Sequence, residues 1–298
     1  MRPTGTLHLG HLAGALKNWV SLQDAYECFY MVADWHALMS EYASPAAIIP
    51  FIRECVADWI AVGLDPSRTA IFRQSDVREH AELHLLLSLI TPLPWLERCP
   101  TYKEQLQEIT GRDLMTYGFL GYPVLQAADI LLYRASAVPV GKDQVPHLEL
   151  TREIARRFNG FYGPVFPEPQ AILTSASKVL GLDNRKMSKS YGNFIALADP
   201  PEVVTEKVRT MITDPSRIRL ADPGHPEVCT VFSYWGGFAA ARSTEVEGWC
   251  RSARVGCTEC KARLAAALNA LLDPIREKRR EVLAGGGVEK ILRAGAER

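Results

Sequence analysis

The sequence predicts an α/β protein, in which a doubly wound parallel sheet is followed by an all-helical C-terminal region. Two observations support this class. In the first half, short apolar runs of strand length alternate with longer runs whose apolar residues recur every three or four positions, as in a parallel sheet with crossover helices. After about residue 199 the strand-like runs fade and helical patterns remain.

The elements of the first half are indicated by apolar spacing and by the residues that end them. Leu12, Leu16 and Trp19 recur at helical spacing near the start of the chain. Gly63 lies near the end of the second helical run, and Pro92 follows the third. We expect strands at 28–34, 70–75, 137–140 and 171–175, and helices at 11–24, 45–64, 81–91, 122–133 and 147–159.

Two strong helical patterns follow in the second half. The run at 200–213 opens with two prolines, which suit the first turn of a helix. The run at 260–283 is long, and we expect Pro274 to interrupt it. The C-terminal third is therefore predicted to be a helical domain.

Composition excludes several classes of protein. The chain has 298 residues and a net charge of zero, and no apolar run approaches the roughly 20 residues of a membrane helix. No secretory signal is apparent, so we expect a cytoplasmic enzyme. From Arg242 to Arg298, twelve Lys and Arg stand against eight Asp and Glu. This excess fits a polyanion partner, although a solvated helical face would explain it equally well.

The first chemical signal is the stretch RPTGTLHLGH at the start of the chain. Gly5, Gly10 and Gly14 let a ligand approach the backbone, and a helix N-terminus attracts phosphate. His8 and His11 add donors that can stabilise charge on a phosphate in a transition state. A capped helix with two surface histidines would give the same pattern.

The second signal is RKMSKSYGN at 185–193. Lys186 and Lys189 lie in a segment without strong helical or strand periodicity, where two ammonium groups can reach a triphosphate. A solvated loop is the simpler explanation of this segment alone. The two signals together, in this order, are more specific, and we predict that they meet on the same phosphates.

HLGH followed by KMSKS resembles the class I aminoacyl-tRNA synthetases. RPTGTLHLGH, VADWHAL, YPVLQAADILLY and GKDQVPHLELTREIARRFN together closely resemble tryptophanyl-tRNA synthetases, over almost the whole chain. The resemblance implies a homodimer whose chain has a Rossmann-type catalytic domain with an inserted helical segment at 1–180, a KMSKS loop at 181–198 and a helical anticodon-binding domain at 199–298. The implied substrates are L-tryptophan, ATP with Mg²⁺ and tRNA(Trp).

The resemblance also implies roles for individual residues, through a tryptophanyl-adenylate formed by in-line attack of the carboxylate on the α-phosphate. The catalytic set is His8, His11, Lys103, Lys186 and Lys189. The ATP-binding set is Arg2, Pro3, Thr4, Gly10, His11, Gly141, Lys142, Asp143, Val179, Lys186, Met187, Ser188, Lys189 and Ser190. The tryptophan-binding set is Asp129, Tyr122, Gln144 and His36, with Asp129 accepting the indole N–H.

The helical run at 122–133 supports this pocket independently. Tyr122, Gln126 and Asp129 are spaced so that they share one helix face, while the other faces are apolar. A polar stripe on an apolar helix is typical of a lined pocket. The alternative is an Asp129 that pairs internally with an arginine.

The start of the chain departs from the family's pattern. The family normally has a short apolar strand before the RPTG turn, whereas this chain begins at Met1, directly at the turn. We therefore expect the first strand of the sheet to be truncated, and we expect an in-frame upstream extension to raise activity.

Four of the seven cysteines form a second departure. Cys229, Cys250, Cys257 and Cys260 have the spacing C-x20-C-x6-C-x2-C. From the residues alone, four thiolates suit a structural Zn²⁺ or a [4Fe–4S] cluster, and spacing favours zinc. A branch of tryptophanyl-tRNA synthetases carries a similar set with an iron–sulfur cluster, so the resemblance favours [4Fe–4S], with Zn²⁺ as the alternative.

Three competing interpretations remain at this stage. A tyrosyl-tRNA synthetase shares the fold and both motifs. A small nucleotidyltransferase shares the first motif but lacks the second motif and the helical C-terminal domain. An inactive synthetase-like binding protein would retain the fold alone, against which the intact His8, His11, Lys186 and Lys189 argue.

Overall fold

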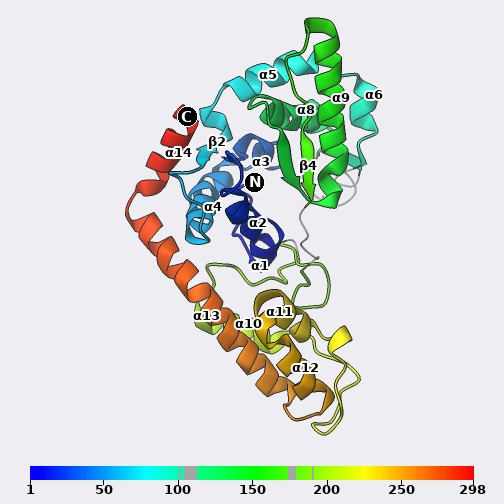
Figure 1. Ribbon diagram of the computed structural model, residues 1–298, viewed down its shortest axis with the longest axis vertical. Coiled ribbons are helices and arrows are strands. Elements are labelled where there is room, and N and C mark those ends of the chain that lie inside the picture. The colour runs from blue at the N-terminus through cyan, green and yellow to red at the C-terminus, as the bar shows by residue number, and fades with distance from the viewer. Residues whose placement is uncertain (101, 104–112, 174–178, 190) are drawn as a thin grey trace.

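The computed structural model describes residues 1–100, 102–103, 113–173, 179–189 and 191–298. An upper part holds the strands and their helices, and a lower lobe is helical (Figure 1). No helix in these ranges is long and apolar enough to cross a membrane.

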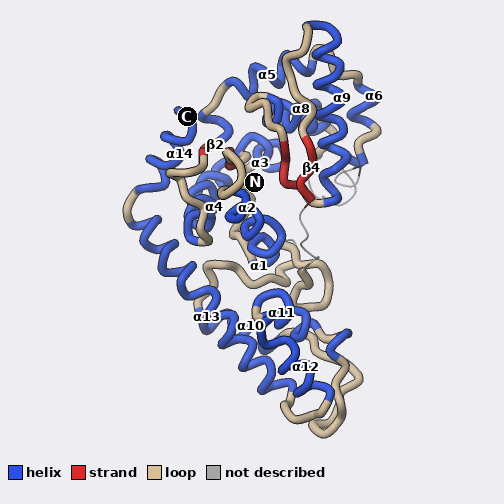
Figure 2. The backbone as a smooth tube through the Cα atoms, in the orientation of Figure 1, coloured by secondary structure: helices blue, strands red, loops and turns tan. Residues whose placement is uncertain are grey.

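The four expected strands are all present, and the α/β class is confirmed. β1 (Phe29–Val32) pairs in parallel with β2 (Ala70–Arg73), and β3 (Ala137–Val140) pairs in parallel with β4 (Gln170–Leu173). Each pair is joined through helices, as parallel strands require. Among the described residues the strands form two two-stranded sheets (Figure 2 shows the β3–β4 pair most clearly).

The space between β1 and β3 is a cavity of about 450 Å³ lined by residues of both strands. The first residue of the chain lies at its edge, alongside β1. The Met1 ammonium donates to the Met31 carbonyl at 2.6 Å, and the Ala33 N–H donates to the Met1 carbonyl at 2.9 Å. Met1 thus makes the backbone contacts of a strand neighbour to β1.

Helices of the first half follow the predicted order. The expected helices at 11–24, 45–64, 81–91, 122–133 and 147–159 are all present, with shifted ends, whereas α3 and α6 were not predicted. The first of them contains a π-helical turn, η1, between α1 and α2. The helices are α1 (Leu9–His11), η1 (Leu12–Leu16), α2 (Lys17–Leu22), α3 (Asp34–Glu41), α4 (Ile48–Ala61), α5 (Glu79–Ser88), α6 (Leu93–Glu97), α8 (Tyr117–Leu131) and α9 (Val145–Tyr162).

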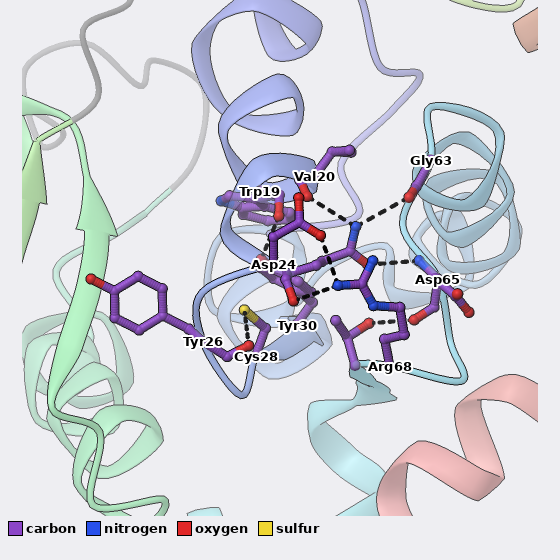
Figure 3. A network of polar contacts seen from close by, with 11 residues as sticks. Trp19, Val20, Asp24, Tyr26, Cys28, Tyr30, Gly63, Asp65 and Arg68 are labelled. Atoms are coloured by element: carbon purple, nitrogen blue, oxygen red, sulfur yellow. Dashed lines mark hydrogen bonds and ion pairs between the residues drawn. The ribbon is translucent and has the colours of Figure 1, made fainter.

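The end of α2 is held by the polar network of Figure 3. Gln23 donates to the carbonyls of Val20 and Gly63, and its own oxygen accepts the Asp65 N–H at 2.7 Å. Arg68 donates to the Asp24 carboxylate and to the Gln23 carbonyl. These contacts tie the first helical run to the loop between α4 and β2, and so fix the direction in which α1 points.

The C-terminal region is helical, as predicted, but Pro274 does not interrupt the long helix. α13 continues through it, because buried Leu272 and Ile275 on either side hold the helix against its neighbours. The helices are α10 (Pro201–Thr210), α11 (Thr230–Phe238), α12 (Ser243–Arg251), α13 (Cys257–Ala284) and α14 (Gly287–Glu297).

The end of the chain returns to the strands. α13 runs from the lower lobe to the middle of the molecule, and α14 lies beside β2 (Figure 1). A Cβ on Gly295 of α14 would lie 2.0 Å from the Ile71 carbonyl oxygen, so only glycine permits this approach. One hydrophobic core therefore joins β1, β2 and α4 to the C-terminal helices, and a second joins α5, α6, α8 and α9.

Candidate functional site

A cavity of about 470 Å³ lies between β1, α3, α8 and the start of α9. It gathers residues that are far apart in the sequence. Its lining includes five predicted site residues, namely Arg2, His36, Tyr122, Asp129 and Gln144. Gln126 also lines it, so the polar stripe predicted on α8 does face a cavity.

Asp129 is the most heavily hydrogen-bonded group in this cavity. His36 Nε2 lies 2.7 Å from one carboxylate oxygen, and the other oxygen faces Gln74 Nε2 at 2.8 Å and His80 Nδ1 at 2.7 Å. Its partners among the described residues are therefore two imidazoles and an amide, with no arginine in this part of the chain. Although burial acts to raise the pKa of Asp129, the two histidines lower it to about 2. Asp129 is an anion at neutral pH.

Two of these partners were missed by sequence reasoning. Gln74 directly follows β2, and His80 is the second residue of α5, so both come from the carboxyl end of a parallel strand, where ligands bind in open α/β sheets. Because His80 Nδ1 donates to the Asp129 carboxylate, Nε2 of the neutral ring accepts a hydrogen bond from the Tyr133 hydroxyl at 2.8 Å. The position just after a strand is the sequence signal that indicates both residues.

Tyr122, expected at the amino-acid end of the substrate, lines the same cavity from α8, about 10 Å along the helix from Asp129. Its hydroxyl is 3.2 Å from Nε2 of His147, whose Nδ1 lies 3.6 Å from the Cys99 thiol. Burial lowers the pKa of His147 to about 4, so this imidazole is neutral. Gln144, one turn before His147, points its amide at Asp143.

The segment at the start of the chain and the segment at 185–193 meet in space. Lys189 Nζ donates to the Gly5 carbonyl at 2.9 Å and to the Thr4 carbonyl at 3.4 Å. The Gly10 N–H lies 3.2 Å from the Met187 sulfur. Segments about 180 positions apart thus form one wall, as the sequence predicts.

His8 and His11 cap the short helix α1 in a way that fixes their tautomers. His8 Nδ1 accepts the Gly10 N–H and His11 Nδ1 accepts the His8 N–H, each at 3.1 Å. Because both Nδ1 atoms are acceptors, each neutral ring carries its proton on Nε2. Burial, together with Lys189, lowers the pKa of His8 to about 4 and that of His11 to about 3. Both rings are therefore neutral Nε2–H donors.

The loop that carries the lysines is held by a residue the sequence reasoning missed. Asn193 is buried, accepts the Ser188 N–H at 2.9 Å and donates to the Asp183 carboxylate and to the Lys186 carbonyl. A Cβ on Gly181 would lie 2.2 Å from its amide nitrogen. Val179 accepts the Met187 N–H at 3.1 Å.

The remaining predicted ATP and catalytic residues differ in exposure. Pro3 is buried, and Gly141 begins the turn before α9. Ser190 lies outside the described residues. The side chains that are exposed are Lys103, Lys142, Asp143 and Lys186.

The four clustered cysteines line one small cavity in the lower lobe, with Arg217, Phe232 and Trp249. Arg217 Nη1 lies 3.9 Å from the Cys257 sulfur. A Cβ added to Gly224 would lie 2.4 Å from the Cys250 sulfur. Burial raises the pKa of the Cys260 thiol to about 11, and the neighbouring indole of the buried Trp235 acts against this shift. Across the described part of the chain, no three His, Cys, Asp or Glu side chains are grouped so as to hold a single metal ion.

The sequence matches known proteins over most of its length. The family model described as tRNA synthetases class I (W and Y) matches residues 1–273. The tryptophan–tRNA ligase of Thermotoga maritima is 52% identical over 285 residues, which cover 95% of this chain and 87% of that protein. The tryptophan–tRNA ligase of Aquifex aeolicus is 44% identical over 353 residues, covering 95% and 89%.

Solved structures show the same likeness. The tryptophanyl-tRNA synthetase of Campylobacter jejuni, complexed with ADP and tryptophan, superposes with a TM-score of 0.91 at 33% identity, covering 100% of this chain and 92% of that one. The tyrosyl-tRNA synthetase of Archaeoglobus fulgidus has a TM-score of 0.71 at 24% identity, covering 94% and 88%, which is a likeness of fold alone.

Proposed function

The chain belongs to the class I tRNA synthetases for tryptophan and tyrosine, and we infer that within this family it is a tryptophan–tRNA ligase. It activates L-tryptophan with ATP and transfers it to tRNA(Trp), as its relatives' shared name indicates. The observation that carries the choice of amino acid is Asp129, a buried anion on the wall of the cavity. A fixed acceptor selects the indole N–H, and a side chain that lacks this donor leaves the carboxylate underpaired.

Both reaction steps use one site. The tryptophan carboxylate attacks the α-phosphate of ATP, forming a P–O bond while pyrophosphate leaves, and the ribose hydroxyl at the end of the tRNA then attacks the adenylate carbonyl and displaces AMP. Tyr122 and Gln144 hold the ammonium and carboxylate end of the amino acid. Neither step needs a covalent enzyme intermediate, so catalysis consists of positioning and charge stabilisation.

The phosphate end supplies the stabilising charges. His8 and His11 donate Nε2–H groups to the triphosphate, and Lys189 is the cation beside them. Lys186, Lys103 and Lys142, with exposed side chains, are the further cations that a triphosphate recruits. Arg2, Pro3, Thr4 and Gly10, with Gly141, Asp143 and Val179, line the nucleotide. The loop residues Met187 and Ser188 bind its phosphates together with Ser190, which lies outside the described residues, and Mg²⁺ accompanies ATP as part of the substrate.

Amino-acid-dependent exchange of pyrophosphate into ATP tests this function. Measured with each of the twenty amino acids, exchange is expected with tryptophan and at least about 10⁴-fold less with phenylalanine, which has no N–H to offer. Exchange supported by tyrosine in place of tryptophan would overturn the assignment in favour of a tyrosyl-tRNA synthetase.

We further propose that Cys229, Cys250, Cys257 and Cys260 hold a [4Fe–4S] cluster, with Zn²⁺ as the alternative. The donor set is four thiols on the wall of one cavity, which suits a cluster in which each iron takes one thiolate. Arg217 and the indole of Trp235 supply donors beside it. The group would cross-link α11, α12 and α13 and would order the nearby Arg251, Arg254, Lys261 and Arg263 toward the tRNA backbone.

Colour and metal content decide between the two groups. Anaerobically purified protein is expected to be brown, with absorbance near 400 nm and iron and sulfide in equal amounts. A colourless protein with one zinc ion per chain would replace the cluster by zinc. Protein without iron or zinc would remove the proposal.

We also propose a homodimer formed through α5 and α6. Four leucines on this surface are exposed to solvent by 53–74%, namely Leu85, Leu86, Leu89 and Leu93. An apolar patch of this kind marks an interaction surface. Sedimentation should give a dimer for the parent protein and a monomer for L86K/L89K, and a monomeric parent would contradict the proposal.

A further inference from the structure

Asp58 is a buried carboxylate close to Lys189 at the proposed phosphate end, and the proposed reaction does not use it. Asp58 lies near the end of α4 with 2% of its side chain exposed. Its partner is Arg279 of α13, whose Nε donates to Asp58 Oδ1 at 2.8 Å and which also pairs with Glu54. The two residues of this pair are 221 positions apart.

Asp58 also contacts the segment that carries the first histidine. The Leu7 backbone N–H and the Lys189 ammonium both lie close enough to the Asp58 carboxylate to act on its pKa. Leu7 is itself buried, and its carbonyl accepts the Leu197 N–H at 2.9 Å. Asp58 therefore faces, from one side, the strand-like segment that residues 195–197 hold from the other.

This segment sets the place of the His8 ring. His8 forms an antiparallel bridge with Ala196, and the Leu9 N–H donates to the Ile195 carbonyl at 3.0 Å. A displacement of Leu7 is transmitted to His8 because the two residues are adjacent. A shift of about 1 Å at a catalytic group can cost about 10²-fold in rate.

α13 connects this contact to the lower lobe. The helix has 28 residues, a length of about 42 Å, and carries Cys257 and Cys260 in its first turn and Arg279 near its end. Figure 1 shows it running from the lower lobe up to the region of α4. Arg279 thus belongs to the same rigid element as two of the four clustered cysteines.

We propose that Asp58 and Arg279 are positioning residues for tryptophan activation: Arg279 holds the Asp58 carboxylate, which holds Leu7 and thereby places the His8 donor against the triphosphate. This rests on the proposed function, because adenylate formation is the step it supports. A purely structural ion pair would support folding and leave the ratio of kcat to tryptophan binding unchanged.

Two double variants separate the two roles, because both remove the buried charges and differ only at the acceptor for Leu7. D58N/R279M keeps an oxygen that accepts the Leu7 N–H, whereas D58L/R279M replaces it with an apolar side chain of similar volume. Removing both members of a buried ion pair is often neutral for stability. We therefore expect both variants to fold with thermal midpoints within a few degrees of each other.

The expected result is a difference in kcat alone. In pyrophosphate exchange, kcat of D58L/R279M should fall at least fivefold below that of D58N/R279M, while the tryptophan dissociation constant of the two differs less than twofold. R276M is the matched control, because Arg276 lies one turn away on α13, is similarly buried and pairs within its own helix.

Each outcome bears on one claim. Equal kcat for the two double variants would overturn the positioning role while leaving the ligase function intact. A loss in R276M as large as in D58L/R279M would also overturn it, because the effect would then belong to α13 in general. If the parent protein showed no tryptophan-dependent exchange, the proposed function itself would fail.

Discussion

The two ends of the proposed active site differ in how their polar groups are already used. At the proposed indole end, Asp129 accepts hydrogen bonds from three side chains and carries a full negative charge. At the proposed phosphate end, His8 and His11 are neutral, and each carries its proton on Nε2. In the proposed reaction, one end is a fixed acceptor that recognises a ground-state group, whereas the other is a set of donors for charge that grows during reaction.

This difference predicts that mutations at the phosphate end reduce kcat, while mutations at the indole end reduce apparent affinity and selectivity. Only interactions that strengthen in the transition state accelerate the chemical step. Variants at the two ends test this contrast, from the largest expected effect to the smallest.

Lys189→Met should have the largest effect. It removes the cation nearest His8 and Gly5, and loss of one transition-state donor costs about 10²–10³ in kcat. Stopped-flow formation of the adenylate gives this rate, and tryptophan fluorescence titration gives the dissociation constant, which should stay within twofold. Lys290→Met on the exposed face of α14 is the control. Equal losses in rate and affinity would place Lys189 in ground-state binding.

Asp129→Asn should produce the opposite signature. The amide keeps the volume of the side chain but loses its charge. Its NH₂ group would face N–H donors such as those of His36 and Gln74. We therefore expect kcat/KM for tryptophan to fall about 10–10²-fold. The loss should appear mainly in KM. An analogue with sulfur in place of the indole N–H should be rejected by the parent and discriminated far less by the variant. Unchanged discrimination would show that the indole N–H is read by another group.

Gly10→Ala should have an intermediate effect at the phosphate end. An added Cβ would lie 2.9 Å from the His8 ring and 3.2 Å from the Met187 sulfur, so the ring or the loop must shift. We expect kcat to fall several-fold to about tenfold with tryptophan affinity unchanged. Gly118→Ala, where an added Cβ meets nothing within 4 Å, is the matched control at the start of α8. Equal kcat for both variants would mean that the His8 ring tolerates displacement.

The sequence predicted the parts of this site that are marked by local patterns. All four strands follow apolar runs, and the meeting of the two phosphate motifs follows from their joint occurrence. The partners of Asp129 could not be predicted in this way. Gln74 and His80 lie about 50 positions away on other elements, and no periodicity within one helix brings them to it.

The missed elements have similar physical causes. α3 is short and partly polar, and α11 contains two consecutive glycines, so neither shows the apolar spacing of a long helix. Pro274 was expected to interrupt α13, but the packing of Leu272 and Ile275 outweighs the missing hydrogen bond. The Asp58–Arg279 pair joins two helices at opposite ends of the chain, which only the folded structure reveals.

The smallest effect concerns stability against acid, and it follows from the neutral histidines. Burial lowers the pKa of His8 and of His147 to about 4 and that of His11 to about 3. An unfolded histidine titrates near 6.5, so between about pH 6.5 and pH 4 the unfolded chain binds more protons than the folded one. The free energy of unfolding should therefore fall as the pH falls through this window.

His11 supplies the sharpest test of this trend, because its pKa is lowered furthest. Urea unfolding at pH 7 and pH 5 should show a smaller drop for His11→Asn than for the parent, by at most about 1.4 kcal/mol per pH unit. Identical drops in the two proteins would mean that His11 titrates alike in the folded and unfolded chains, and the contrast between a charged Asp129 and a neutral pair of imidazoles would lose half of its basis.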